Sequence, residues 1–205
     1  MFLLWFVNGS ASSSYKVPDI RQYVLQIEKK YSIPEFLLDA IIQQESNYVV
    51  KALNPDSREG VRVSSFGLGQ LTLPTAETHC KLNKQQVYHP IKNIECSAKV
   101  LKWQLIRYKG NIKRAVAAYQ WGTPCECDGQ VFTQRFKSRT RICLKKGNMT
   151  PMVCKRRGTF WNQWYVDQVL RKRTLSRNKI KGCFERMPCK TKVKKWPWHK
   201  VLNWS

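Results

Sequence analysis

Apolar residues recur at helical spacing along most of the first 122 residues. Ile20, Val24 and Ile27 lie three or four positions apart, and Asp19 is a suitable N-cap immediately before them. This pattern predicts a first helix that ends near Tyr31.

A second amphipathic stretch follows directly. Ser32 and Glu35 have the spacing of a capping box, and Pro34 suits a first helical turn. The sequence predicts a buried helix that ends near Ser46 and contains Leu37, Leu38, Ala40, Ile41 and Ile42.

Polar and turn-forming residues over 47–66 predict a long loop, which leads into the glycine-punctuated segment 67–70. Apolar periodicity then predicts further helices over 74–78, 93–108, 113–120 and 160–171. Between the last two of these, residues 123–158 hold four cysteines and little periodicity, with candidate strands at 130–136 and 140–144. The fold class expected is mainly α, with a disulfide-tied insertion.

The division expected along the chain has three parts. The short apolar run in 1–14 indicates a signal-peptide remnant or a disordered N-terminus, and the former implies export. Residues 15–172 form the helical domain, including the 123–158 insertion. Residues 173–205 form a basic extension that contains Trp196, Trp198 and Trp204.

Charge and cysteine content narrow the classes of partner. The formal net charge is +24, and residues 123–205 carry 21 basic and four acidic side chains. Such a surface concentrates near polyanions, and charge alone does not choose among nucleic acid, anionic lipid and anionic wall polymers. Because no nucleic-acid-binding module is recognisable, and because Trp together with Lys and Arg suits anionic interfaces, the expected partners of the basic extension are anionic wall polymers or lipid and not nucleic acid. The eight cysteines lack zinc-ligand spacing, so we expect disulfides in an oxidising compartment, with no metal and no cofactor.

Glu45 is the candidate for acid chemistry. It follows Leu38, Ile41 and Ile42 by seven, four and three positions, so it lies on the buried face at the C-terminal end of its helix. Burial and the negative end of the helix dipole both favour a raised pKa, which suits a general acid. A carboxylate at a solvated helix end is the alternative interpretation of the same spacing.

Five ordered motifs extend this observation. The segment from roughly Tyr31 to Gly122 resembles the soluble lytic transglycosylase family, which is related to goose-type lysozymes, through Gln44-Glu45-Ser46, Gly67-Leu68-Gly69-Gln70, Leu73-Pro74-Thr75-Ala76, Asn93-Ile94 and Ala117-Ala118-Tyr119-Gln120-Trp121-Gly122. Tyr165-Val166-Asp167-Gln168-Val169 is similar to the closing helix of that family. The resemblance implies a lysozyme-like helical domain with a saccharide cleft.

The resemblance also implies roles for individual residues. Glu45 matches the catalytic acid/base, and Tyr119 matches the tyrosine whose hydroxyl orients it. The expected substrate-binding residues are Ser46, Ser65, Gly67, Leu68, Gln70, Asn93 and Gln120. Because some members have cysteines at similar places, Cys80 and Cys96 are expected to pair, whereas the connectivity of the other six cysteines stays open.

Three positions depart from the family pattern: Asn47, Gly69 and Gln120 stand where the family usually has Gly, Met and Asn. The missing Met side chain at Gly69 is expected to widen or reshape the cleft. The loop between the last two helices is also much longer than usual, because residues 123–158 intervene.

The function implied is cleavage of the β-1,4 bond between N-acetylmuramic acid and N-acetylglucosamine in peptidoglycan, by a monomer in the periplasm or outside the cell. A single clear carboxylate favours transglycosylation with 1,6-anhydro products, since ordinary glycosidases use two. Two alternatives stay open. One is goose-type hydrolysis with Asp56 and Glu59 positioning water, and the other is a non-catalytic cationic antibacterial protein that binds walls or membranes.

Overall fold

The computed structural model describes residues 17–185, except 56, 59–60, 63, 137–138 and 146–148. The expected N-terminal segment 1–14, the tryptophans of the basic extension, and Asp56 and Glu59 therefore lie outside the described residues. In the described part of the chain, no helix has the length and apolar character needed to cross a membrane.

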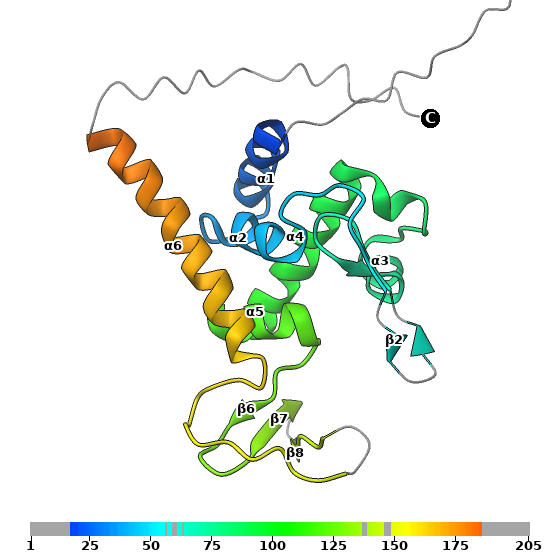
Figure 1. Ribbon diagram of the computed structural model, residues 1–205, viewed down its shortest axis with the longest axis vertical. Helices are drawn as coiled ribbons and strands as arrows, with labels where there is room; N and C mark the ends of the chain where they lie inside the picture. Colours follow the sequence, from blue (N-terminus) through cyan, green and yellow to red (C-terminus); the bar gives the residue numbers. More distant parts are fainter. Residues whose placement is uncertain are drawn as a thin grey trace, which may run out of the picture.

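Helices build the main body, and α2 lies among the other helices in Figure 1. They are α1 (Val17–Lys30), α2 (Leu37–Glu45), α3 (Leu73–Cys80), α4 (Pro90–Arg107), α5 (Ile112–Trp121) and α6 (Gln163–Glu185), with a 3₁₀ turn at Gln86–Tyr88. Helix α2 has no exposed side until its last turn, and its core side chains Leu37, Leu38, Ala40, Ile41 and Ile42 are fully buried. The mainly helical fold predicted from the apolar periodicity is thus confirmed.

Short strands follow α2 and supply the loop that faces it. Strands β1 (Leu53–Asn54), β4 (Ser65–Phe66) and β5 (Leu71–Thr72) form an antiparallel sheet in the order β1-β4-β5. Strands β2 (Ser57–Arg58) and β3 (Val61–Arg62) pair as a separate hairpin. The disulfide between Cys80 and Cys96 links the end of α3 to α4, and it joins the two cysteines expected to pair.

The insertion forms a small sheet of its own, which lies below α5 and the start of α6 in Figure 1. Strands β6 (Glu126–Cys127), β7 (Phe132–Phe136) and β8 (Arg139–Ile142) are antiparallel neighbours in that order. Disulfides Cys125–Cys143 and Cys127–Cys154 cross-link it around a minor core that includes Phe132 and Met152. A segment with so few apolar residues gains its order mainly from such cross-links.

The capping box expected at Ser32 and Glu35 is wrong. Helix α2 begins at Leu37, its N-cap Phe36 is left-handed, and no side chain of the N-cap residue caps it. Instead Glu28 of α1, which is only 2% exposed, accepts the backbone N–H groups of Phe36, Leu38 and Asp39 at 2.8, 2.7 and 3.0 Å. A carboxylate at the positive end of α2 thus satisfies donors that the local sequence leaves unpaired.

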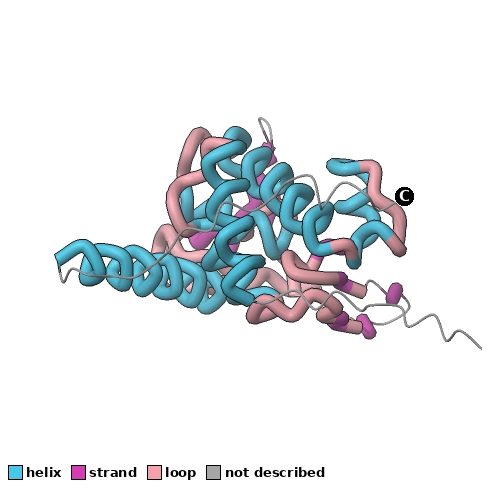
Figure 2. Tube along the Cα trace, turned by 90° about the horizontal axis from the view of Figure 1, so that it is seen from above, coloured by secondary structure: helices cyan, strands magenta, loops and turns pink. Residues whose placement is uncertain are grey.

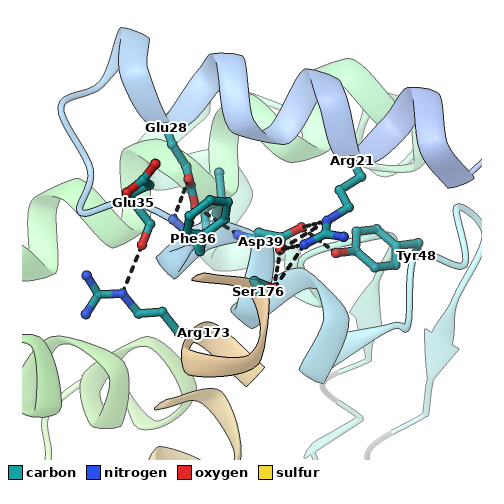
Figure 3. A network of polar contacts seen from close by, with 9 residues as sticks. Arg21, Glu28, Glu35, Phe36, Asp39, Tyr48, Arg173 and Ser176 are labelled. Carbon is teal, nitrogen blue, oxygen red and sulfur yellow. Dashed lines mark hydrogen bonds and ion pairs between the residues drawn. The ribbon is translucent and has the colours of Figure 1, made fainter. Parts of the chain in front are cut away.

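Asp39 lies at the centre of a buried polar network, drawn in Figure 3. Arg21 of α1 donates to both of its carboxylate oxygens, at 3.0 Å from Nε and 2.9 Å from Nη2. The hydroxyls of Tyr48 and Ser176 also donate to it, the latter at 3.1 Å. Because Asp39 is in α2, Arg21 in α1 and Ser176 in α6, this carboxylate links three helices by hydrogen bonds.

Helix α6 extends beyond the expected boundary at residue 172 and continues to Glu185, past the neighbouring helices in Figure 2. Ser176 is 6% exposed and lies in the Asp39 network, and Arg173 Nε donates to Glu35 O at 2.9 Å. The first part of the expected basic extension is therefore built into the helical body.

Replacing Asp39 with Ala should lower the free energy of unfolding by about 3–5 kcal/mol, because it leaves Arg21 and two buried hydroxyls without their acceptor. Urea denaturation monitored by circular dichroism measures this loss. Asp167→Ala is the matched control: Asp167 is exposed on α6 and accepts one bond from Gln163, so its removal should cost under about 0.5 kcal/mol. Equal losses in the two variants would contradict the role assigned to the network.

Candidate active site

A groove of about 1210 Å³ runs across the molecule between the end of α2, the β1–β5 loops and helices α3, α4 and α5. Its lining includes Glu45, Ser46, Asn54, Ser65, Gln70, His79, Trp103, Arg107, Tyr119, Gln120, Trp121, Thr123 and Gln134. The last two residues belong to the insertion. The mixture of hydroxyl, amide and indole groups suits a polar ligand with flat apolar faces, such as a sugar.

Glu45 is the last residue of α2 and lies partly buried in this groove. Burial raises the pKa of its carboxyl group to about 7, while a hydrogen bond from Tyr165 acts in the opposite direction. The Tyr165 hydroxyl donates to Glu45 Oε1 at 2.5 Å. Glu45 therefore holds its proton at higher pH than an exposed glutamate, which is the property of a general acid.

The tyrosine that contacts Glu45 differs from the one expected. Tyr119 lines the groove, but its hydroxyl donates to Gly69 O at 3.0 Å, whereas Tyr165 makes the direct bond to the carboxylate. Glu45 and Tyr165 are 120 positions apart, and α6 brings them together only by packing on α2. The one local signal for Tyr165 is its place in the motif that resembles the closing helix.

The expected substrate-binding residues separate into two groups. Ser46, Ser65, Gln70 and Gln120 line the groove, whereas Gly67, Leu68 and Asn93 do not. Asn93 is fully buried. Its side chain accepts from Gly69 N at 2.8 Å and donates to Phe66 O and Val87 O at 3.0 and 2.8 Å.

Asn93 therefore shapes the glycine turn instead of contacting a ligand. Gly67 has φ +71° and lies so close to Asn93 that an added Cβ would come within 2.4 Å of its Nδ2. Only glycine fits this backbone conformation and this approach. The turn in its place directs Gln70 into the groove, where Gln70 Nε2 also donates to Gly67 O at 2.9 Å.

The cleft is expected to be widened or reshaped at Gly69, and the structure shows no widening there. Gly69 is buried, and a Cβ added there would lie 1.9 Å from Ser97 Oγ and 2.8 Å from the Tyr119 hydroxyl. The space of a side chain at this position is thus already filled by neighbours from α4 and α5. Glycine at this position lets Ser97 and Tyr119 pack directly against the backbone behind the groove wall, and it does not enlarge the groove.

Glu45 is the only acidic residue among the described residues that line the groove. Arg107 is the cation there, and its guanidinium lies 5.0 Å from the Trp103 ring. The ring of His79 lies 5.1 Å from the same indole. Trp103 and Trp121 stay 43% and 41% exposed. Within the described part of the chain no three His, Cys, Asp or Glu side chains gather in a way that would hold a metal ion.

Residues 22–138 match the Transglycosylase SLT domain family. The fold is similar to lytic transglycosylase Slt from Pseudomonas aeruginosa, solved as an inactive mutant, with a TM-score of 0.52 and 20% identity over 78% of this chain. The chain spans only 24% of that larger protein. A structure of wild-type DslA matches 46% of this chain and 70% of its own length at 17% identity, with a TM-score of 0.39.

Replacing Tyr165 with Phe should raise the pKa of Glu45 further, by about one unit, since a hydrogen bond to the ionised carboxylate is lost. Carboxyl ¹³C chemical shifts followed against pH measure this change. Tyr119→Phe is the control, because that hydroxyl donates to Gly69 and should affect the titration less. An unchanged or lowered pKa of Glu45 in the Tyr165 variant would contradict the assignment.

Replacing Gly69 with Ala should destabilise the protein by about 1–3 kcal/mol, since the new methyl group overlaps Ser97. Adding Ser97→Gly removes the two Ser97 atoms that overlap it and should restore part of that loss. Thermal unfolding of the single and double variants tests this coupling. Simple additivity of the two changes would show that the clash is not the cause.

Proposed function

The chain belongs to the Transglycosylase SLT domain family, and on that premise we propose that it cleaves the glycan strands of peptidoglycan as a lytic transglycosylase. The bond cleaved is the β-1,4 linkage between N-acetylmuramic acid and N-acetylglucosamine. The substrate lies across the groove, with the scissile oxygen at Glu45.

The observation that carries this proposal is a single partly buried carboxyl group in a sugar-sized groove, with its pKa raised to about 7. In the first step the Glu45 carboxylic acid protonates the glycosidic oxygen, and the bond from C1 of the muramic acid to that oxygen breaks. Tyr165 then stabilises the carboxylate that forms, since its hydroxyl donates to Oε1.

In the second step the Glu45 carboxylate takes the proton of the muramic acid C6 hydroxyl, and O6 bonds to C1. The product carries a 1,6-anhydro ring, and Glu45 regains its proton. One group thus serves as acid and then as base, with a pKa near the working pH for both roles.

Hydrolysis, as in goose-type lysozymes, is the competing outcome. It requires a second group that activates water, and glycosidases generally supply this with another carboxylate. The described lining of the groove contributes only Glu45 as an acidic residue, and Asp56 and Glu59, the candidates for positioning water, lie outside the described residues. The raised pKa of Glu45 favours an enzyme over a cationic protein that only binds walls or membranes.

The biological setting follows from the substrate. Enzymes of this family act on peptidoglycan in the periplasm or outside the cell, and the three described disulfides suit an oxidising compartment of that kind. We further propose that the protein acts as a monomer, and that its basic residues beyond α6 bind anionic wall polymers or lipid.

Glu45→Gln should lower the rate of peptidoglycan cleavage by at least about 100-fold, because the amide cannot donate a proton to the leaving oxygen. Release of soluble fragments from purified sacculi measures the rate. Glu77→Gln is the matched control, since Glu77 is exposed on α3 outside the groove and its loss should leave the rate unchanged.

Mass spectrometry of the released fragments identifies the second step. Anhydro ends support transglycosylation, and reducing ends indicate hydrolysis. Full activity of Glu45→Gln would contradict any role of that carboxyl in the reaction.

A further inference from the structure

The insertion contributes directly to the wall of the groove. Gln134 of β7 lines it together with Thr123, and Gln134 Nε2 donates to Thr123 O at 2.8 Å. Among the described residues none donates to Gln134 Oε1, so this oxygen is available as an acceptor. A segment that lies outside the helices therefore supplies part of the groove wall.

Arg141 lies beside Gln134 on the same face of the sheet. The antiparallel register pairs the two residues across β7 and β8, which places their Cβ atoms about 5 Å apart. Just beyond Arg141, Cys143 is bonded to Cys125, so a disulfide holds this end of β8 against the segment that connects α5 to β6. The backbone at Arg141 is thereby held beside Gln134, whose side chain lines the groove, although Arg141 itself is not one of the lining residues.

Arg141 is exposed, and none of the described carboxylates pairs with it. Glu126 is held by Arg114 of α5 at 2.8 and 3.1 Å, and Asp128 accepts the N–H groups of Gln130 and Val131. Arg107 adds a second guanidinium near this end of the groove, where it donates to Gly122 O and Thr123 Oγ1. The edge formed by the insertion is therefore cationic and attracts an anionic part of a ligand.

We propose that Gln134 and Arg141 form a subsite for the peptide stem of peptidoglycan, in which Arg141 binds a stem carboxylate and Gln134 accepts a stem amide N–H. This inference rests on the proposed function, because it names the part of the same substrate that leaves the groove. A guanidinium matches a carboxylate in geometry and charge. The subsite makes the enzyme prefer glycan strands that carry peptides.

A phosphate of an anionic wall polymer has a similar charge and also binds arginine. The stem carboxylate is favoured because Gln134 is part of the groove wall itself, and the stem is covalently attached to the sugar that the groove holds. The substrates of the test must therefore be free of wall polymers.

The test compares Arg141→Gln with Arg135→Gln. Arg135 is exposed on the same sheet, but it follows Gln134 directly along β7 and pairs with Thr140. Its side chain therefore projects from the face of the sheet opposite to that of Gln134 and Arg141. Each variant is assayed on polymer-free glycan strands with intact peptide stems, and on the same strands after an amidase has removed the stems. Arg141→Gln should raise KM for the peptide-bearing strands by about threefold to tenfold. The kcat of Arg141→Gln, and its KM for the stripped strands, should stay at the wild-type values. Arg135→Gln should keep the wild-type kcat and KM on either substrate.

Three results would overturn the subsite: an unchanged KM of Arg141→Gln for the peptide-bearing strands, an equal rise in KM for both substrates, or a rise in KM that appears only when the assay is repeated on strands that still carry wall polymer. Gln134→Ala provides a second variant with the same expected selectivity, and circular dichroism checks that each variant folds. Absence of cleavage by the wild-type protein would instead contradict the proposed function. The subsite is then tested by a binding assay, in which Glu45→Gln and the double variant Glu45→Gln/Arg141→Gln are each sedimented together with the peptide-bearing strands or with the stripped strands.

Discussion

The hydrogen-bonded carboxylate of Asp39 determines how the helices surround the groove. It is fully buried, and it receives donors from Arg21 on α1, from Tyr48 after α2 and from Ser176 on α6. A buried charge is tolerated only when such partners surround it, so the three segments have one mutually consistent arrangement. In that arrangement α6 lies along α2, and its first turns bring Tyr165 to Glu45.

The acid site carries a cost in stability. Burial raises the pKa values of Glu28 and Glu45 to about 7 from an ordinary 4.5. Between these values the folded protein binds more protons than the unfolded chain, so both groups make folding less favourable as the pH rises through that interval. Glu28 offsets part of this loss of stability by accepting the N–H groups at the start of α2. The raised pKa of Glu45 instead serves the proposed reaction, because it keeps the carboxyl group partly protonated near neutral pH.

The insertion shows how a segment with little apolar content still adds to a binding surface. Two disulfides cross-link its sheet internally, and the Arg114–Glu126 ion pair joins the sheet to α5. The exposed cations of that sheet do not need burial partners, because they remain hydrated until a ligand arrives. Their arrangement follows from strand register, which places alternate side chains toward the groove and away from it.

The sequence by itself determined the helical fold and the location of the acid on a buried helix, because both depend on the spacing of apolar residues within a few turns. The ordered motifs added the family and part of the groove lining, including Ser46, Gln70 and Gln120. Only the tertiary structure decided that Tyr165 contacts Glu45, that Glu28 caps α2, that Asn93 supports a turn and that Gly69 fills a tight gap. Each of these depends on a contact between different segments of the fold, which is set by how the helices pack and not by any local pattern.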